Sequence, residues 1–204
     1  MDEMIREPKQ KRAIEKKEKI IEVGFELICE NGYYNTNTAE IAKKAGVSTG
    51  IVYQYFKDKY DIFMEGLKKY GDEIFFPMLV TTMNDFSIDN LEEILRQMIQ
   101  KYITDHKMSQ TAHEEITAMI HSDQEVANYF YSRELLMTER IKELLLKNGF
   151  EDHHLNEKVH IMIGLIDNLC HEIIYHNHSN MNYDIMKDMI INSILHLFQM
   201  EEQK

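Results

Sequence analysis

Tryptophan is absent from this chain of 204 residues, and proline and glycine are scarce, at 2 and 8 residues. Tight turns between β-strands draw heavily on glycine and proline, so an architecture of many short strands is disfavoured. No stretch alternates apolar and polar residues beside hairpin turns, whereas apolar residues recur at helical spacing through most of the chain. The sequence therefore predicts an all-α fold.

Long apolar runs and paired cysteines are missing as well. No run approaches the ~18 apolar residues that a membrane-spanning helix needs, and the charged first residues lack the apolar core of a signal peptide. The two cysteines, Cys29 and Cys170, are far apart and lack CxxC spacing. We expect both to be small buried side chains of a cytoplasmic protein that has no membrane partner.

The net charge of −12 is unevenly distributed along the chain. Residues 1–60 hold 11 Lys+Arg and 10 Asp+Glu, a balance of +1, whereas residues 61–204 hold 12 and 25, a balance of −13. Only the local field at a contact surface steers DNA binding, so the acidic total does not exclude it. The acidic charge does argue against sequence-independent coating of nucleic acid, which needs an extended basic surface.

The most informative stretch runs from Asn37 to Lys59, with the sequence NTAEIAKKAGVSTGIVYQYFKDK. Asn37 opens an N-x-x-E capping box, and Gly46 stands where a helix ends in left-handed backbone. Ser48 can then cap a second helix over residues 49–56. The first turn of this second helix is small and polar and its last turn is aromatic, which suits entry into a DNA major groove. A plain helical hairpin is the alternative.

The stretch resembles the helix-turn-helix of TetR-type transcriptional repressors, and the similarity covers roughly residues 14 to 75. The residues that carry it are Thr38, Ile41, Ala42, Ala45, Gly46, Val47, Ser48, Gly50, Tyr53, Tyr55, Phe56 and Lys59. Tyr55 stands where many members have histidine, and it keeps a hydrogen-bond donor there. Tyr60 replaces the usual acidic residue, and the sequence suggests no role for it.

The resemblance implies a three-helix DNA-binding domain over residues 1–58, with the reader motif at 37–56. It also implies a homodimer that binds a palindromic operator in double-stranded DNA. The expected DNA-binding residues are Thr38, Ser48, Thr49, Gly50, Tyr53, Gln54, Tyr55 and Lys59. Within this set Gln54 and Thr49 are the expected base readers. The two tyrosines and the lysine are the expected phosphate contacts.

Residues 59–204 are expected to form a larger helical domain that binds a ligand and mediates dimerisation. Helical periodicity predicts helices at about 10–31, 59–76, 89–102, 109–121, 122–147, 155–176 and 183–200. Ser122 and Glu125 have capping-box spacing and would open the 122–147 helix. The segment 78–88 is either a loop or a short helix.

The candidate ligand-binding residues combine apolar or amphipathic walls with two polar groups. They are Tyr70, Phe75, Met98, Tyr102, Met119, Phe130, Met137, Met162, Asp167 and His171. Methionine side chains adapt to irregular cavities, and Asp167 between apolar neighbours would favour a cationic or hydrogen-bond-donating ligand. Two alternatives stay open: the methionines are plain core packing, and Asp167 pairs with His171 instead of contacting a ligand.

The last two predicted helices carry apolar residues on more than one face, which a helix buried on one side does not need. Two such helices from each of two chains can form a four-helix dimer interface. The candidate dimerisation residues are Ile166, Leu169, Ile173, Ile190, Ile194 and Leu197. The alternative is that this face covers the core of its own domain.

Catalytic and metal-binding patterns are not found. The sequence has no P-loop, GxSxG or HExxH motif, and its ten histidines, all beyond residue 105, form no HxxxH pair. Asp167 and His171, four residues apart, could contact one metal ion or each other. We therefore expect no enzymatic activity, no cofactor and no metal site. A transcriptional repressor released from DNA by a small-molecule effector is the favoured function. The alternative is a helical interaction module whose acidic C-terminal domain binds a protein partner.

Overall fold

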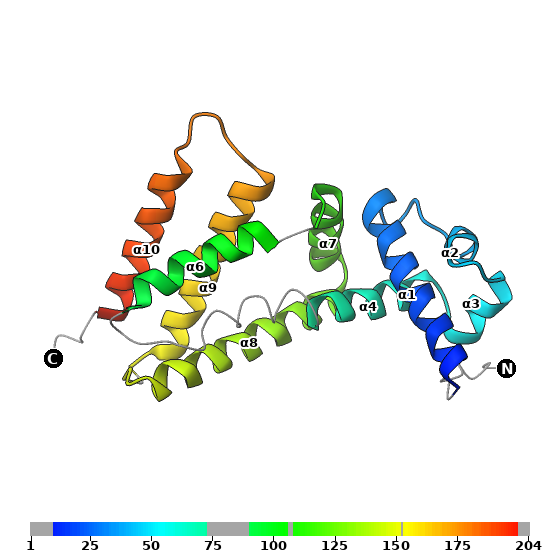
Figure 1. The fold of residues 1–204 in the computed structure, drawn as a ribbon, viewed down its shortest axis with the longest axis horizontal. Coiled ribbons are helices and arrows are strands. Elements are labelled where there is room, and N and C mark those ends of the chain that lie inside the picture. Colours follow the sequence, from blue (N-terminus) through cyan, green and yellow to red (C-terminus); the bar gives the residue numbers. More distant parts are fainter. Residues whose placement is uncertain (1–9, 73–89, 106–107, 152, 200–204) are drawn as a thin grey trace. The chain divides into compact units, whose positions relative to one another are not determined.

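The computed structural model describes residues 10–72, 90–105, 108–151 and 153–199, and regular structure in these ranges is helical throughout (Figure 1). The all-α prediction is confirmed. The helices are α1 (Lys11–Asn31), α2 (Thr38–Ala45), α3 (Thr49–Tyr55), α4 (Lys59–Tyr70), α6 (Leu91–Asp105), α7 (Gln110–Ser122), α8 (Gln124–Lys147), α9 (Leu155–Tyr175) and α10 (Tyr183–Gln199). No helix in the described ranges is long and apolar enough to cross a membrane.

The chain divides into two compact units. The N-terminal unit comprises residues 1–74 and 108–130, and the C-terminal unit comprises residues 75–107 and 131–204. Helix α8 is divided between the units: residues 124–130 belong to the N-terminal unit and residues 131–147 to the C-terminal unit. Helix α7 groups with α1 to α4 in the N-terminal unit. The functional division expected at residue 58 stays a prediction.

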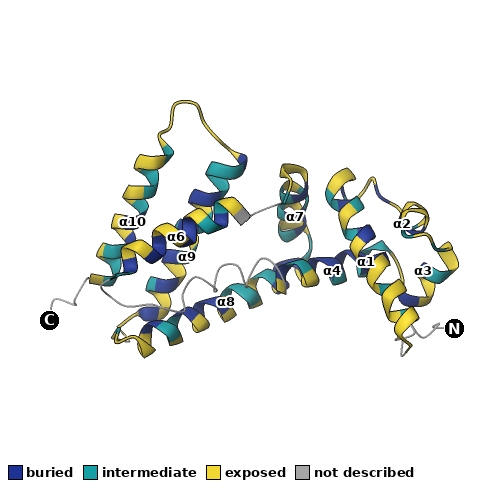
Figure 2. Ribbon diagram, viewed as in Figure 1, coloured by how far each residue is buried: buried dark blue, intermediate teal, exposed yellow. Residues whose placement is uncertain are grey.

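The core of the N-terminal unit forms where α1 crosses the helices that follow it. Ile20, Ile41, Val52 and Ile62 are fully buried there, one from each of α1 to α4, and Figure 2 marks the inward faces of these helices as buried. Helix α1 packs against α2, α4 and α7. Burial of these branched side chains is the main term that stabilises the unit.

The C-terminal unit is built around α9, which packs against α6 and α10. Leu95, Val159, Leu169 and Ile194 are fully buried in its core. The apolar stripes predicted for these helices therefore face one another. Three candidate dimerisation residues are part of this core: Leu169 and Ile194 have no exposed surface and Ile166 is 4% exposed, so burial within their own unit argues against a contact with a second subunit.

One predicted helix start is wrong. Helix α7 continues through Ser122, whose hydroxyl donates a hydrogen bond to the Ala118 carbonyl. The cap of α8 is Asp123, whose Oδ1 accepts from the backbone N–H groups of Glu125 at 2.9 Å and Val126 at 3.0 Å. Both residues are good N-caps, and the carboxylate takes the position because its charge also interacts favourably with the helix N-terminus.

The two cysteines are unreactive. Cys170 is buried and Cys29 is half-buried. Burial raises the pKa of each thiol to about 12, so both stay protonated at neutral pH. The expectation of small buried side chains is confirmed for Cys170 and holds in part for Cys29.

Candidate DNA-binding and ligand-binding sites

The turn between α2 and α3 has the geometry that the sequence predicts. The Asn37 side chain accepts hydrogen bonds from the backbone N–H groups of Ala39 and Glu40, at 3.1 and 3.0 Å. The Glu40 carboxylate accepts from the Asn37 backbone N–H, which completes the capping box. Gly46 ends α2 at φ 70 and ψ 30, in the left-handed region.

Helix α3 presents opposite faces to the core and to solvent. Val52 and Tyr55, three residues apart, are buried on one face. The other face exposes Ser48, Thr49 and Gly50 at its start, and Tyr53 and Gln54 further along. The Ser48 side chain makes no capping bond to α3, although the residue occupies the cap position. The polar surface expected to meet DNA is therefore held on a fixed apolar base.

Two of the predicted DNA-binding residues contact each other. The hydroxyl groups of Tyr53 and Thr38 are 2.9 Å apart, and this hydrogen bond joins α3 to the first residue of α2. Tyr53 is nevertheless 51% exposed. The pair thus places two hydroxyl groups at one edge of the exposed face, where they can reach a phosphate oxygen.

Tyr55 does not lie on the exposed face. Only 8% of its surface is exposed, and its ring packs edge-on against Phe56, with 6.5 Å between the ring centroids. Tyr55 is for this reason a weaker candidate for a phosphate contact than the exposed Tyr53. The helical period places it on the same side as Val52, and there its apolar ring contributes to the core.

Lys59 is engaged within its own domain. Its ammonium group donates to the backbone carbonyl groups of Tyr33 and, at 2.9 Å, of Thr36, and it lies 4.3 Å from the Tyr33 ring centroid. Lys59 thus ties the start of α4 to the loop before α2. Lys57, which the sequence analysis missed, is exposed directly after α3 and is the better candidate for a phosphate contact.

Five of the ten candidate ligand-binding residues come together in the C-terminal unit. They line a cavity of about 50 Å³. Its walls are Met98 and Tyr102 of α6, Met137 and Ile141 of α8, and Met162, Ile163, Ile166 and Asp167 of α9. Three methionines, Met98, Met137 and Met162, thus lie around one acidic group in this cavity.

The polar side of this cavity is a three-residue cluster. The Tyr102 hydroxyl donates to Asp167 Oδ1 at 3.2 Å and lies 3.4 Å from His171 Nε2. His171 Nδ1 lies 3.3 Å from Asp167 Oδ2. Burial first, and then the Asp167 charge, raises the pKa of Tyr102 well above its usual value, so the phenol stays protonated. Asp167 thus pairs with His171 and also lines the cavity, and its contact with a ligand stays a prediction.

The Asp167 side chain is 46% exposed, whereas the Tyr102 residue is buried. The carboxylate therefore lies between the apolar cavity and the solvent, at a place where a charged group can stay hydrated. This geometry suits a ligand that has an apolar part inside and a polar or cationic head at the carboxylate.

The remaining candidates lie elsewhere. Tyr70 stacks on Phe25, with 6.0 Å between ring centroids, and Phe130 packs edge-on against its neighbour Tyr129. Met119 is buried in α7, which packs against α1. All three belong to the N-terminal unit and do not line the cavity. Phe75 lies outside the described residues.

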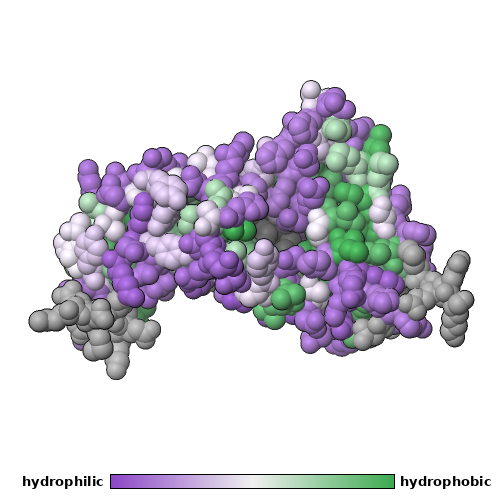
Figure 3. Space-filling view, turned by 180° about the vertical axis from the view of Figure 1, so that it is seen from behind, coloured by the Kyte–Doolittle hydropathy of each residue, from purple (hydrophilic) through white to green (hydrophobic). Residues whose placement is uncertain are grey.

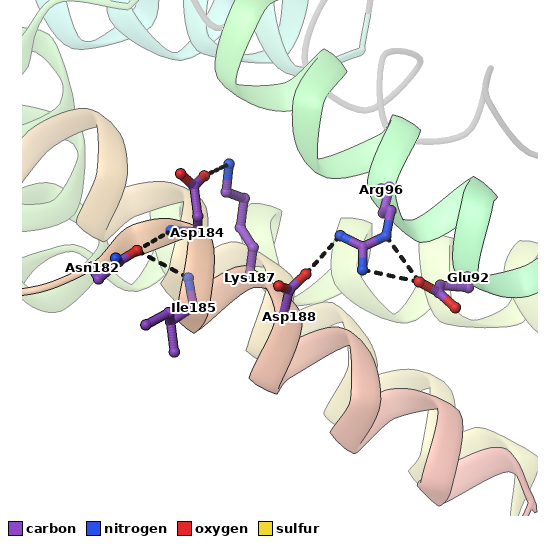
Figure 4. A network of polar contacts seen from close by, with 7 residues as sticks. All are labelled: Glu92, Arg96, Asn182, Asp184, Ile185, Lys187 and Asp188. Carbon is purple, nitrogen blue, oxygen red and sulfur yellow. Dashed lines mark hydrogen bonds and ion pairs between the residues drawn. The ribbon is translucent and has the colours of Figure 1, made fainter.

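A larger cleft of about 840 Å³ runs between α6 and α10. Several of its charged side chains are paired (Figure 4). Arg96 lies 2.8 Å from Asp188, and 2.9 Å from Glu92 one turn away on its own helix; Lys187 pairs with Asp184 at 2.7 Å. Exposed pairs of this kind are well hydrated and contribute little binding energy. The smaller cavity, which has apolar walls and a carboxylate, is the stronger candidate for an effector.

Exposed apolar side chains gather on α9 and α10, as Figure 3 shows for one face of the C-terminal unit. Ile185 and Met189, one helical turn apart on α10, are 57% and 64% exposed, and Ile161 of α9 is also exposed. Ile173, Ile190 and Leu197 of the predicted dimerisation set are half-buried. Clusters of exposed apolar residues are typical of interaction surfaces.

A metal site finds no support in the described parts of the chain. No group of three or more His, Cys, Asp or Glu side chains there could hold a metal ion. His160 and His178 each lie 3.6 Å from one glutamate only, Glu134 and Glu172 respectively.

Comparison with known proteins identifies relatives of the helix-turn-helix. Residues 20–65 match the sequence profile described as bacterial regulatory proteins, tetR family. The HTH-type transcriptional regulator HbdR of Aromatoleum sp. (strain CIB) is 47% identical over 58 residues, which are 28% of this chain and 25% of HbdR. The fatty acid metabolism regulator protein of Bacillus subtilis (strain 168) is 46% identical over 61 residues, 30% of each chain.

The chain therefore spans between a quarter and a third of the length of these curated relatives. The fold agrees over a longer range. A protein from Mesorhizobium loti MAFF303099, described as a TetR-family transcriptional regulator, has a TM-score of 0.70 at 19% identity, over 92% of this chain and 97% of that one. The matched proteins are regulators and not enzymes.

The contacts of Lys59 predict a role in stability. Lys59→Ala should lower the free energy of unfolding by about 1–3 kcal/mol, because it removes charge-assisted hydrogen bonds to two backbone carbonyl groups. Urea unfolding followed by circular dichroism measures this change. Lys57→Ala, the matched control, should change it by less than about 0.5 kcal/mol. Equal stability of the two variants would contradict the assignment of Lys59.

Proposed function

The chain belongs to the TetR family of bacterial regulatory proteins, and from this premise we propose that it is a homodimeric repressor whose operator affinity a small molecule lowers. The observation that carries the proposal is the exposed polar face of α3, whose opposite face is buried in the core of the N-terminal unit. A helix exposed in this way can enter a major groove.

The roles on α3 follow from exposure and chemistry. Gln54 and Thr49 read base edges, because both are exposed and carry groups that pair with bases. Tyr53 and Thr38 contact phosphate through their paired hydroxyl groups. Ser48 and Gly50 allow close approach at the start of the helix. Lys57 supplies the positive charge that the sequence analysis assigned to Lys59.

The effector binds the cavity beside Asp167 in this proposal. Drug-sized ligands need pockets of roughly 300 Å³ or more, so the ligand enlarges the cavity of about 50 Å³ by moving methionine side chains. An amphiphile with a slender apolar tail and a cationic head fits the walls and the carboxylate. To weaken DNA binding tenfold, it has to prefer the non-binding state by about 1.4 kcal/mol.

Dimerisation uses the exposed apolar face of α9 and α10. Ile185 and Met189 of α10 and Ile161 of α9 supply its exposed side chains, and the half-buried Ile173, Ile190 and Leu197 are the predicted residues compatible with it. Two helices from each chain then form a four-helix interface. A two-fold axis gives two copies of α3, which suits a palindromic operator.

Base reading is tested by selecting bound duplexes from a randomised DNA library. The parent protein should enrich a palindromic sequence, and Gln54→Ala should relax the preference at one base pair per half-site by roughly 1–3 kcal/mol. Lys57→Ala should instead weaken binding to every duplex and lower the salt slope by about one unit. Failure of the parent to select any sequence would refute the proposal, and identical losses in both variants would refute these roles.

Dimerisation is tested by Met189→Glu. The new charge would be buried between two chains, so sedimentation should detect monomers, while circular dichroism should detect unchanged helix content. Leu135→Glu, at an exposed apolar position on α8, is the matched control and should leave the dimer intact. Leu169→Glu should unfold the C-terminal unit instead, because that residue is core. A dimeric Met189→Glu protein would place the interface elsewhere.

The effector site is tested by thermal shift with alkyltrimethylammonium ions and alkanols of matched chain length. Cations should stabilise the parent more than the alkanols do, and Asp167→Asn should lose this difference while it keeps the response to alkanols. Asp188→Asn, in the cleft between α6 and α10, should behave like the parent. If only Asp188→Asn lost the difference, the site would lie in that cleft. If neither class of compound stabilised the parent, the proposed ligand class would be wrong.

A further inference from the structure

Two carboxylates, one within α7 and one between α7 and α8, contact the segments that flank the α2–α3 pair. The backbone N–H of Tyr33, before α2, donates to Glu115 Oε2 at 3.0 Å. The hydroxyl of Tyr60, after α3, donates to Asp123 Oδ1 at 2.7 Å. Glu115 lies on α7 and Asp123 caps α8, so both contacts link segments that are far apart in sequence.

The Glu115 contact is close as well as polar. Gly32 has φ +89, and a Cβ atom added there would lie 2.7 Å from Glu115 Oε1. A side chain there would push the Glu115 carboxylate aside, and the conformation itself is strained for residues other than glycine. The carboxylate therefore lies directly against the backbone where α1 ends and the chain turns toward α2.

The Tyr60 contact explains a residue that the sequence analysis left without a role. Its hydroxyl lies 2.7 Å from Asp123 Oδ1 and 3.5 Å from Glu125 Oε2. An acidic side chain at this position would face two carboxylates and be repelled, whereas a phenol donates a hydrogen bond. The pKa of Asp123 is lowered, first by the Val126 backbone N–H and then by Tyr60, so it remains a charged acceptor.

Lys59 connects these two contacts. Its ammonium group binds the Tyr33 and Thr36 carbonyl groups, and it directly precedes Tyr60. The loop before α2 and the start of α4 are thereby fastened to each other and, through Glu115 and Asp123, to α7 and α8. The α2–α3 segment between them is held at both ends.

We propose that Glu115 and Asp123 are positioning residues that hold the α2–α3 pair in the orientation that binds DNA. The proposal rests on the proposed function, since neither residue touches DNA in it. Glu115, Asp123 and the α2–α3 pair all belong to the N-terminal unit.

The test removes each contact with a minimal change. Tyr60→Phe and Glu115→Ala should each weaken binding to the duplex that the parent selects by about tenfold, which corresponds to about 1.4 kcal/mol. The salt slope should not change, because no phosphate contact is lost. Glu115→Gln keeps an oxygen acceptor and should restore most of the affinity. Tyr131→Phe and Glu114→Ala, exposed positions outside these contacts, are the matched controls and should bind like the parent.

Amide hydrogen exchange gives a second readout that needs no DNA. Residues 33–60 should exchange faster in Tyr60→Phe and Glu115→Ala than in the parent, while α9 should keep its protection. Unchanged affinity and unchanged exchange in both variants would overturn the proposal. A loss of protection spread equally through α9 would also overturn it, because the contacts would then act only on global stability. If the parent selected no duplex, the proposed function would fail, and exchange alone would still decide whether the two contacts hold the segment.

Discussion

The close crossing of α1 and α4 is the constraint on which the reader helix depends. Each helix has a glycine at the crossing: a Cβ atom at Gly24 would lie 2.4 Å from Ile62 Cγ2, and one at Gly66 would lie 2.5 Å from Phe25 Cβ. Backbones this close fix α4 against α1, and the first turn of α4 carries Lys59 and Tyr60. The position of the start of α4, directly after α3, therefore depends on the absence of side chains at Gly24 of α1 and Gly66 of α4.

Helix α3 is only seven residues long, so its stability and its recognition surface share the same few positions. A helix of this length is not stable alone, and its conformation depends on the burial of Val52 and Tyr55. Their burial leaves Thr49, Tyr53 and Gln54 to face outward. A substitution on the buried face would thus alter DNA recognition indirectly, through the orientation of residues that it does not touch.

Features governed by neighbours in sequence could be predicted from the sequence, and features governed by distant packing could not. The capping box at Asn37 and the left-handed Gly46 depend on local backbone chemistry, so spacing alone indicates them. The burial of Tyr55 depends on which side of α3 meets α1, and that of Leu169 on how α6 and α10 pack around α9. Amphipathic spacing identifies an apolar face without naming its partner.

The same reasoning explains why only part of the candidate ligand site could be found. Met98, Tyr102 and Asp167 are on helices that pack together, whereas Met119 has the same chemistry on a helix that packs against α1. The contacts also add a condition that the sequence could not supply. Tyr102 and His171 already lie beside the Asp167 carboxylate, so a ligand head there has to replace their interactions with ones at least as favourable. A cation without hydrogen-bond donors can leave the Tyr102 bond in place and add only charge, which is the less demanding exchange.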